Sequence, residues 1–261
     1  MAETTWYSQG AFCWAECSTS DLEGAKAFYA KVFNWEVEET PIPGGVYVQF
    51  KRNGKSVAAA AEQQEQEKTQ GIPPHWNVYI AVDDADTVSK EAEQLGATIL
   101  APAFDVLESG RMAVVADPTG GAIGFWQAKD HIGAEVYAEE NAMTWWELMT
   151  PDPKRATEFY TSLFGYETEM QDTSTGPYVV LKHKGENAAG IMAPPAGTPP
   201  IWTPYVHVAD ADATLTAATA AGAETLMRVT EGKGIGRLSW IKDPQGAIIA
   251  FIQPAPREDT A

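Results

Sequence analysis

Two acidic residues follow tryptophans at the same spacing in two widely separated apolar segments of the chain. Glu16 lies two residues after Trp14, and Glu147 lies two residues after Trp145. Alternate residues of a β-strand share a face, so each glutamate is expected beside its tryptophan. A carboxylate in a partly apolar pocket has a raised pKa and can serve as a general base. A general base in an aromatic site is therefore one interpretation of these residues.

The same carboxylates also have a structural explanation. A buried carboxylate needs a compensating partner, and Arg111 and Arg237 are the obvious candidates. We expect an Arg–Glu pair in each half of the chain, which would account for both residue types without catalysis.

Strand alternation extends these two faces to other residues. The candidate catalytic residues are Glu16, Glu147 and His207, and the candidate ligand-binding residues are Trp14, Asn77, Tyr79, Arg111, Trp126, Trp145, Thr203, Tyr205 and Arg237. Small residues at Gly124 and Ala250 leave room on the last strand of each half. Aromatic walls with a single polar group are typical of a site for a planar or hydrophobic small molecule. Aromatic side chains that merely fill the concave face of a sheet explain the pattern equally well.

The remaining histidines suggest no chemistry. His75 is expected at the rim of a site, His131 in a linker as a packing or capping residue, and His183 in solvent between two lysines. The counterpart of His207 in the first half is Ala81, so chemistry that needs a histidine would belong to the second half alone. The sequence contains no phosphate-binding loop, dinucleotide fingerprint, nucleophile elbow or zinc-ligand spacing.

The charge balance narrows the class of partner. The 261 residues include 18 basic and 36 acidic side chains, which gives a formal net charge of −18. Such a surface repels nucleic acid and anionic lipid headgroups. The longest apolar run, residues 247–252, is far too short to cross a bilayer, and no secretory leader is visible. We expect a soluble cytoplasmic protein whose partner is a small molecule, with neither nucleic acid nor a membrane as partner.

The two cysteines agree with a reducing compartment. Cys13 and Cys17 lie in one predicted strand, where their Cα atoms would be about 13 Å apart and beyond disulfide reach. We expect two reduced, half-buried thiols, because two cysteines at this spacing form no recognisable metal site.

The chain repeats itself at two constant offsets. An offset of 131 aligns Phe28-Tyr29 with Phe159-Tyr160 and Tyr47-Val48 with Tyr178-Val179. After the polar loop of residues 62–68 the offset falls to 126, and it then aligns Trp76 with Trp202 and Asp117-Pro118 with Asp243-Pro244. Constant offsets with one length change in a loop indicate a duplicated domain. We expect domain 1 over residues 8–128, a linker over 129–140 and domain 2 over 141–255.

Each half divides again into two modules of strand, helix and three strands, which predicts an α+β fold. The capping box Ser20-Asp21-Leu22-Glu23 begins the first helix and Asn34 ends it. Asp84 caps the second helix, which ends at Gly96. In the second half Asp152 caps the helix that has Pro153 at its first position, and Gly222 closes the last helix. The strands of the first half are predicted at residues 11–17, 36–40, 46–52, 56–61, 77–82, 98–104, 112–116 and 122–127.

The order and type of these residues resemble the vicinal oxygen chelate superfamily, which includes glyoxalase I, extradiol dioxygenases and bleomycin-resistance proteins. The resemblance rests on the helix motifs and closing turns of both halves, namely Ala27-Phe28-Tyr29, Glu158-Phe159-Tyr160, Asp117-Pro118-Thr119-Gly120 and Asp243-Pro244-Gln245-Gly246. Within the superfamily the chain is most similar to two-domain glyoxalase-like proteins. The resemblance implies two tandem domains, each with a curled mixed sheet around a cavity.

The resemblance also implies where a metal would be held. Metal-dependent members use His or Glu on the first strand, on the strand that opens the second module and on the final strand. These positions fall on Trp14, Asn77 and Gly124 in the first half, and on Trp145, Thr203 and Ala250 in the second. None of the six is a histidine or a carboxylate, so no cofactor is predicted, although a shifted alignment would leave a divalent metal open.

Two functions of different class follow from the resemblance. One is a glyoxalase-like enzyme that acts on a small hydrophobic, aromatic or carbonyl-containing molecule through Glu16 or Glu147, together with a neighbouring tyrosine or His207. The other is a binding protein that sequesters such a molecule, as bleomycin-resistance proteins do. A metal-dependent lyase or dioxygenase would apply if the ligand positions are misaligned, and recruitment of the surface to protein interactions, with vestigial cavities, is a further possibility. The chain is expected as a monomer or a homodimer.

Overall fold

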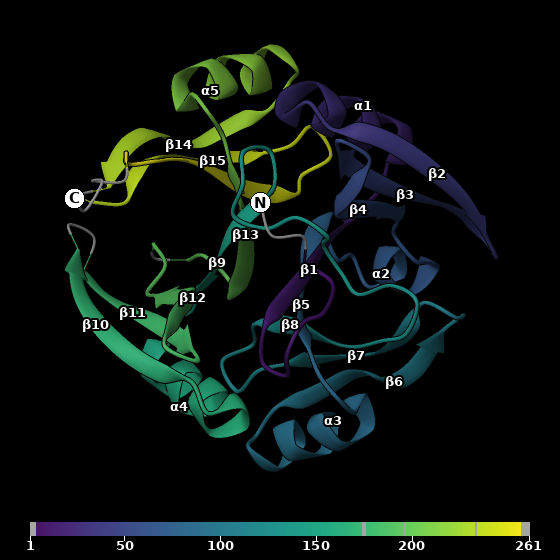
Figure 1. Ribbon diagram of the computed structural model, residues 1–261, viewed down its shortest axis with the longest axis vertical. Helices are drawn as coiled ribbons and strands as arrows, with labels where there is room; N and C mark the ends of the chain where they lie inside the picture. The colour runs from purple at the N-terminus through teal and green to yellow at the C-terminus, as the bar shows by residue number, and fades with distance from the viewer. Residues whose placement is uncertain (1–3, 174–175, 196, 233, 257–261) are drawn as a thin grey trace. The chain divides into compact units, whose positions relative to one another are not determined.

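The computed structural model describes residues 4–173, 176–195, 197–232 and 234–256 (Figure 1). Each half of the chain forms one eight-stranded mixed sheet, which confirms the predicted α+β architecture with two equivalent mixed sheets in tandem. The first sheet has the order β2-β3-β4-β1-β5-β8-β7-β6, and the second has the equivalent order β10-β11-β12-β9-β13-β16-β15-β14.

The strands follow the predicted order, with ends that differ by a few residues. Those of the first sheet are β1 (Phe12–Thr19), β2 (Glu36–Ile42), β3 (Gly45–Arg52), β4 (Lys55–Glu62), β5 (His75–Ala81), β6 (Thr98–Val106), β7 (Gly110–Ala116) and β8 (Ala122–Ala128). Those of the second are β9 (Met143–Met149), β10 (Glu167–Thr173), β11 (Gly176–His183), β12 (Glu186–Met192), β13 (Ile201–His207), β14 (Glu224–Gly232), β15 (Gly236–Lys242) and β16 (Ile248–Pro254). In each module the helix carries the chain back, so that the first strand pairs in parallel with the last, as β1 does with β4 and β5 with β8.

Five helices occur in the described residues: α1 (Leu22–Phe33), α2 (Glu65–Thr69), α3 (Ala85–Gln94), α4 (Pro153–Phe164) and α5 (Ala211–Ala220). The predicted caps Asp84 and Asp152 accept backbone N–H groups at the starts of α3 and α4. The predicted start of α1 is one residue early, because Asp21 rather than Ser20 accepts the N–H of Gly24. Helix α2 lies in the segment that was predicted as a polar loop, since its five residues are too few to give a periodic signal.

Contacts along the backbone group the chain into two compact units, each with residues from both repeats. Unit 1 consists of the chain up to Ala15 together with Asn77–Glu135 and Trp145–Thr203. Unit 2 consists of Glu16–Trp76, Val136–Thr144 and the chain from Pro204 onward.

A tyrosine–aspartate hydrogen bond joins the two repeats inside unit 2. The hydroxyl of Tyr29 on α1 donates to Asp243 Oδ2 at 2.6 Å, in the turn between β15 and β16. The other oxygen of Asp243 accepts the backbone N–H groups of the turn, including that of Ala247 at 2.8 Å. The indole N–H of Trp76 donates to the Tyr29 hydroxyl at 2.9 Å. The Phe-Tyr and Asp-Pro motifs of the two repeats therefore meet in one buried network.

Unit 1 contains the same network with the repeats exchanged. Tyr160 on α4 donates to Asp117 Oδ2 at 3.0 Å, and Trp202 donates to the Tyr160 hydroxyl at 2.9 Å. Asp117 also accepts the backbone N–H groups of Thr119 and Gly121 in its turn. Each repeat thus supplies a tyrosine to one unit and an aspartate to the other.

Aromatic side chains fill the core around these networks. In unit 1, Phe12 stacks on Trp146 with ring centroids 5.8 Å apart and lies 5.2 Å from Trp202. In unit 2, Tyr29 packs edge-on against Phe50 and Trp76. Both cysteines are free, as expected, but they are fully buried rather than half-buried.

No helix in the described part of the chain has the length and apolar character needed to span a membrane.

Replacing Tyr29 by Phe should destabilise the protein by about 2 kcal/mol, since the change removes a hydrogen bond to a buried carboxylate and leaves the indole N–H of Trp76 without its acceptor. Tyr137→Phe is the matched control, because that hydroxyl donates to the uncharged backbone carbonyl of Thr144 and its loss should cost about 1 kcal/mol. Urea unfolding of both variants measures the difference. Equal losses would show that the network has no special role in stability.

Candidate functional site

The carboxylate of Glu147 in unit 1 is held by a tyrosine. Glu147 lies on β9 with only 5% of its surface exposed. The Tyr178 hydroxyl on β11 donates to Glu147 Oε2 at 2.8 Å, and the indole N–H of Trp145 donates to that hydroxyl at 2.9 Å. Burial, followed by the negative charge of Glu147, raises the pKa of Tyr178 well above its usual range. The three groups therefore form a chain of hydrogen bonds that ends on a carboxylate.

A glycine makes room for this tyrosine. Gly190 on β12 is the register partner of Glu147. A Cβ atom at position 190 would overlap the hydroxyl of Tyr178. The strand beside Glu147 must therefore lack a side chain at this point for the Tyr178 hydroxyl to reach the carboxylate.

The first repeat places the same pair in unit 2. Glu16 on β1 receives a hydrogen bond from Tyr47 on β3, and its register partner on β4 is Ala59. Glu16 is half-buried, and desolvation raises its pKa, an effect that the Tyr47 hydrogen bond opposes. Offsets of 131 relate Glu16 to Glu147 and Tyr47 to Tyr178, so the Glu–Tyr pair is duplicated together with the fold.

A second carboxylate acts on Glu16 alone. The negative charge of Glu67 on α2 also raises the pKa of Glu16. Glu67 is fixed by the hydroxyl of Ser18 at 3.0 Å and by the backbone N–H of Gln64 at 2.9 Å. His75 Nε2 lies 3.7 Å from the other carboxylate oxygen of Glu67. The shorter loop of the second repeat, residues 193–200, contains no acidic residue, so Glu147 has no counterpart of Glu67 in this loop.

The aromatic residues predicted in the first half lie together in unit 1 with a histidine from the predicted linker. His131 packs edge-on against Trp14, with centroids 4.6 Å apart, and against Trp126 at 5.8 Å. Trp126 donates its indole N–H to the His131 carbonyl at 2.8 Å and lies 6.4 Å from Tyr79. Burial lowers the pKa of His131 to about 4. The histidine is therefore a neutral part of this cluster, in agreement with the packing role expected for it.

The other predicted residues are placed as follows. In unit 2, Trp240 on β15 donates to the hydroxyl of Tyr205 at 2.6 Å, and His207 is half-buried at the end of β13. In unit 1, Asn77 is half-buried, whereas Thr203 is fully buried and its hydroxyl has no hydrogen-bond partner among the described residues.

The expected Arg–Glu pairs are wrong. Arg111 forms a bidentate pair with Asp86 on α3, with Nε 2.7 Å from Oδ2, and its guanidinium is part-exposed. Arg237 pairs with Asp212 on α5 through Nη1, and its Nε lies 4.0 Å from Glu231 on β14. These arginines tie β7 and β15 to the neighbouring helices. The partners of the glutamates are tyrosines instead.

The residues at the superfamily's metal-ligand positions do not fit a metal. Trp14 packs on His131, and the ring of Tyr79 covers Gly124, where a Cβ atom would overlap it. In the first repeat, the ring of Tyr79 thus fills the space into which a side chain at position 124, the third ligand position, would project. Across the described ranges, no group of three or more His, Cys, Asp or Glu side chains is arranged to hold an ion.

Three residues of the site were not selected from the sequence. Tyr47 and Tyr178 carried a signal, because they align in the repeat as Tyr-Val pairs, but the alternation argument followed only the strands of the expected metal site. Glu67 gives no such signal in the sequence, because the five residues of α2 are too few to show helical periodicity.

The comparisons with known proteins agree with this fold. The family model described as the Glyoxalase/Bleomycin resistance protein/Dioxygenase superfamily matches residues 14–125, and a glyoxalase-like domain model matches residues 145–251. The chain belongs to this superfamily and contains two of its domains in tandem.

Similar proteins cover nearly all of the chain. It is 39% identical to the "Putative glyoxylase CFP32" of Mycobacterium bovis, over 99% of this chain and 100% of that protein. It is 31% identical to the "Anthracycline biosynthesis protein DnrV" of Streptomyces peucetius, over 95% of each. Among solved structures, the Mn(II)-bound glyoxalase of Novosphingobium aromaticivorans matches with a TM-score of 0.63 at 15% identity, over 94% of this chain and 82% of that one. The last similarity shows the fold alone.

Replacing Gly190 by Ala should break the Tyr178–Glu147 hydrogen bond, because the added methyl group occupies the position of the hydroxyl. We expect a loss of about 1–3 kcal/mol in the free energy of unfolding. The matched control in the other repeat is Ala59→Gly, which should cost no more than about 1 kcal/mol. A loss for Gly190→Ala that is no larger than the control would show that Tyr178 moves aside freely.

The raised pKa of Glu16 predicts a pH-dependent stability. The folded state binds this proton more tightly than the unfolded state, so the contribution of Glu16 is present at low pH and is lost as the pH rises through the folded pKa. The stability of the protein relative to Glu16→Gln should therefore fall as the pH rises above the usual glutamate range and then level off. Denaturant unfolding against pH measures this, with the exposed Glu91→Gln as control. A difference that increases with pH would contradict the raised pKa.

Proposed function

We propose that the protein acts on a small aromatic or carbonyl-containing molecule at its Glu–Tyr pairs, with Glu16 as a general base. The observation that carries the proposal is the duplicated carboxylate whose bound partner is a neutral tyrosine rather than an arginine. An arginine would lower the pKa of the carboxylate and weaken it as a base, whereas the hydrogen bond from the neutral Tyr47 only partly offsets the rise that desolvation causes in Glu16.

The two glutamates differ in their suitability for catalysis. Glu16 is half-buried and has a raised pKa, which makes its carboxylate a stronger base than that of an exposed glutamate. Glu147 is more deeply buried and engaged by Tyr178. We therefore assign proton transfer to Glu16 and the orientation of a bound molecule to the Trp145–Tyr178–Glu147 chain.

The proposed step is proton abstraction beside a carbonyl group. The Glu16 carboxylate takes the proton from the carbon, and the electron pair of the broken C–H bond moves toward the carbonyl oxygen to give an enolate. No metal enters the step, because the residues at the superfamily's ligand positions do not fit one. The names of two relatives, "Putative glyoxylase CFP32" and "Anthracycline biosynthesis protein DnrV", support a small-molecule substrate.

Sequestration without turnover is a second candidate, favoured by the burial of Glu147. A carboxylate with 5% exposure and a tyrosine partner can fix a polar group of a ligand without exchanging a proton with it. In that case both repeats would bind and neither would react.

Glu16→Gln should separate these candidates. With a panel of aromatic ketones and 2-oxoaldehydes in D₂O, the protein should exchange the proton beside the carbonyl for deuterium, as followed by NMR. Glu16→Gln should reduce the exchange rate by about 100-fold or more, because it removes the base, while the Kd changes little. Glu147→Gln is the matched control and should raise the Kd more than it lowers the rate.

The remaining outcomes are also informative. Exchange that persists in EDTA is expected, and its loss on chelation would overturn the metal-free step. Saturable binding without any exchange, weakened by Trp145→Ala, would replace catalysis by sequestration. Exchange at the same rate in Glu16→Gln would overturn the assignment of the base.

A further inference from the structure

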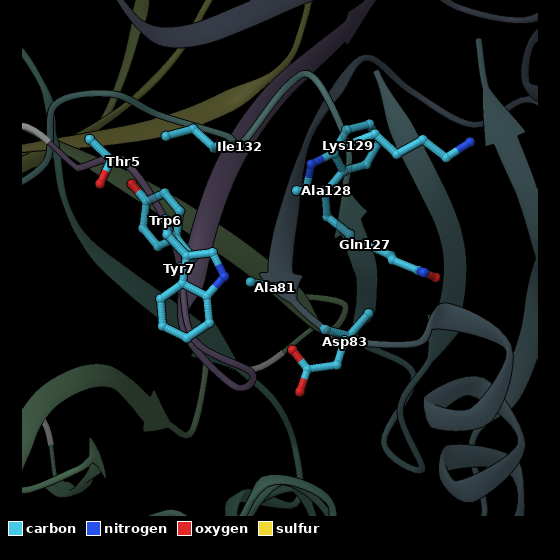
Figure 2. Close-up of a pocket in the computed structure, with 11 residues that line it drawn as sticks. Thr5, Trp6, Tyr7, Ala81, Asp83, Gln127, Ala128, Lys129 and Ile132 are labelled. Atoms are coloured by element: carbon cyan, nitrogen blue, oxygen red, sulfur yellow. The ribbon is translucent and has the colours of Figure 1, made fainter. Parts of the chain in front are cut away.

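A cavity of about 400 Å³ lies in unit 1 and contains no residue of either Glu–Tyr pair (Figure 2). Its walls come from three segments: the N-terminal segment with Thr5, Trp6 and Tyr7, the end of β5 and the residues after it, and the end of β8 and the residues after it. The second segment supplies Ala81, Val82 and Asp83, and the third supplies Trp126, Gln127, Ala128, Lys129 and Ile132. The volume is in the range of small-molecule sites.

An exposed tryptophan is held at this cavity. Trp6 has 68% of its surface exposed. The segment is fixed on both sides of Trp6, because the Thr4 N–H donates to the Glu135 carbonyl at 3.2 Å and the Tyr7 hydroxyl donates to the Ala134 carbonyl at 2.7 Å. The indole is therefore presented by an anchored segment, and its large apolar face is available to stack on a ring.

The charges around the cavity are not balanced. The ammonium group of Lys129 pairs with Asp105 at 3.2 Å, and Figure 2 shows its side chain and that of Gln127 extending away from the Thr5–Tyr7 segment. The carboxylate of Asp83 lies on the side that faces this segment. Within the described residues it has no ion-pair or hydrogen-bond partner, since only the backbone N–H of Asp83 is engaged, by Gln9. The cavity therefore presents one uncommitted negative charge beside an aromatic face.

We propose that this cavity binds an aromatic molecule that carries a protonated amine, with the ring on Trp6 and the amine at Asp83. An ammonium group placed near an indole and a carboxylate gains from both the cation–π and the charge interaction. The second repeat cannot form the same site, because an offset of 126 replaces Asp83 by Ala209, Trp126 by Ile252 and Lys129 by Ala255. The site is thus a property of the first repeat and is separate from the duplicated pairs.

Two fluorinated probes of opposite charge test this proposal by ¹⁹F NMR titration at physiological ionic strength. The cationic 5-fluorotryptamine should bind more tightly than the anionic 5-fluoroindole-3-propionate. Asp83→Asn should weaken the cation by about 3- to 5-fold and leave the anion no weaker. Trp6→Ala should weaken the cation by about 5- to 10-fold through the loss of stacking.

Asp130→Asn is the matched control for the general attraction of an acidic protein to cations, since Asp130 is exposed and does not line the cavity. Equal affinity for the two probes, equal effects of Asp83→Asn and Asp130→Asn, or no saturable binding of the cation would each overturn the proposal. Glu16→Gln should leave this binding unchanged, so the test is independent of the proposed function.

Discussion

Each closing turn of the protein is built around a buried carboxylate that receives a tyrosine hydroxyl from the other repeat. The aspartate satisfies the backbone N–H groups of its own turn with one oxygen and the tyrosine with the other. Removing either partner would leave polar groups buried without compensation, which is costly in a low-dielectric interior. These hydrogen bonds therefore join the two repeats into units that neither repeat could form alone. The Phe-Tyr motif of each helix supplies the donor, and the Asp-Pro motif of each turn supplies the acceptor.

The Glu–Tyr pairs depend on the same architecture at the level of the strands. In each repeat the first strand supplies the glutamate, the strand two positions away in the sheet supplies the tyrosine, and the strand between them carries a small residue, Ala59 or Gly190, opposite the glutamate. A larger side chain in the middle strand would separate donor and acceptor. The parallel pairing of first and last strands in each module is thus what brings these residues within hydrogen-bond distance.

Much of the fold could be predicted because the repeat doubles every signal. Helix caps such as Asp84 and Asp152 act locally, so the sequence is sufficient to place them. The partners of Glu16 and Glu147 depend on which strands become neighbours, and an argument from alternation gives the face of a residue but not the residue across the sheet. For the same reason Arg111 and Arg237 were assigned to the wrong carboxylates, since their helix partners are set by tertiary packing.

Duplication left the two repeats free to diverge, and they differ beside the Glu–Tyr pairs and in the aromatic cluster rather than in their framework. The helix α2 adds Glu67, whose negative charge raises the pKa of Glu16, whereas the shorter loop of the second repeat, residues 193–200, contains no acidic residue. The linker adds His131 to the aromatic cluster of Trp14 and Trp126, for which the second repeat has Ile252 in place of a second indole. The framework positions, by contrast, keep tyrosine and aspartate in both copies, because a change in one copy would leave its partner in the other repeat unsatisfied. A substitution therefore costs the least stability where a side chain contacts only residues of its own repeat. At these positions the two copies can acquire different functions.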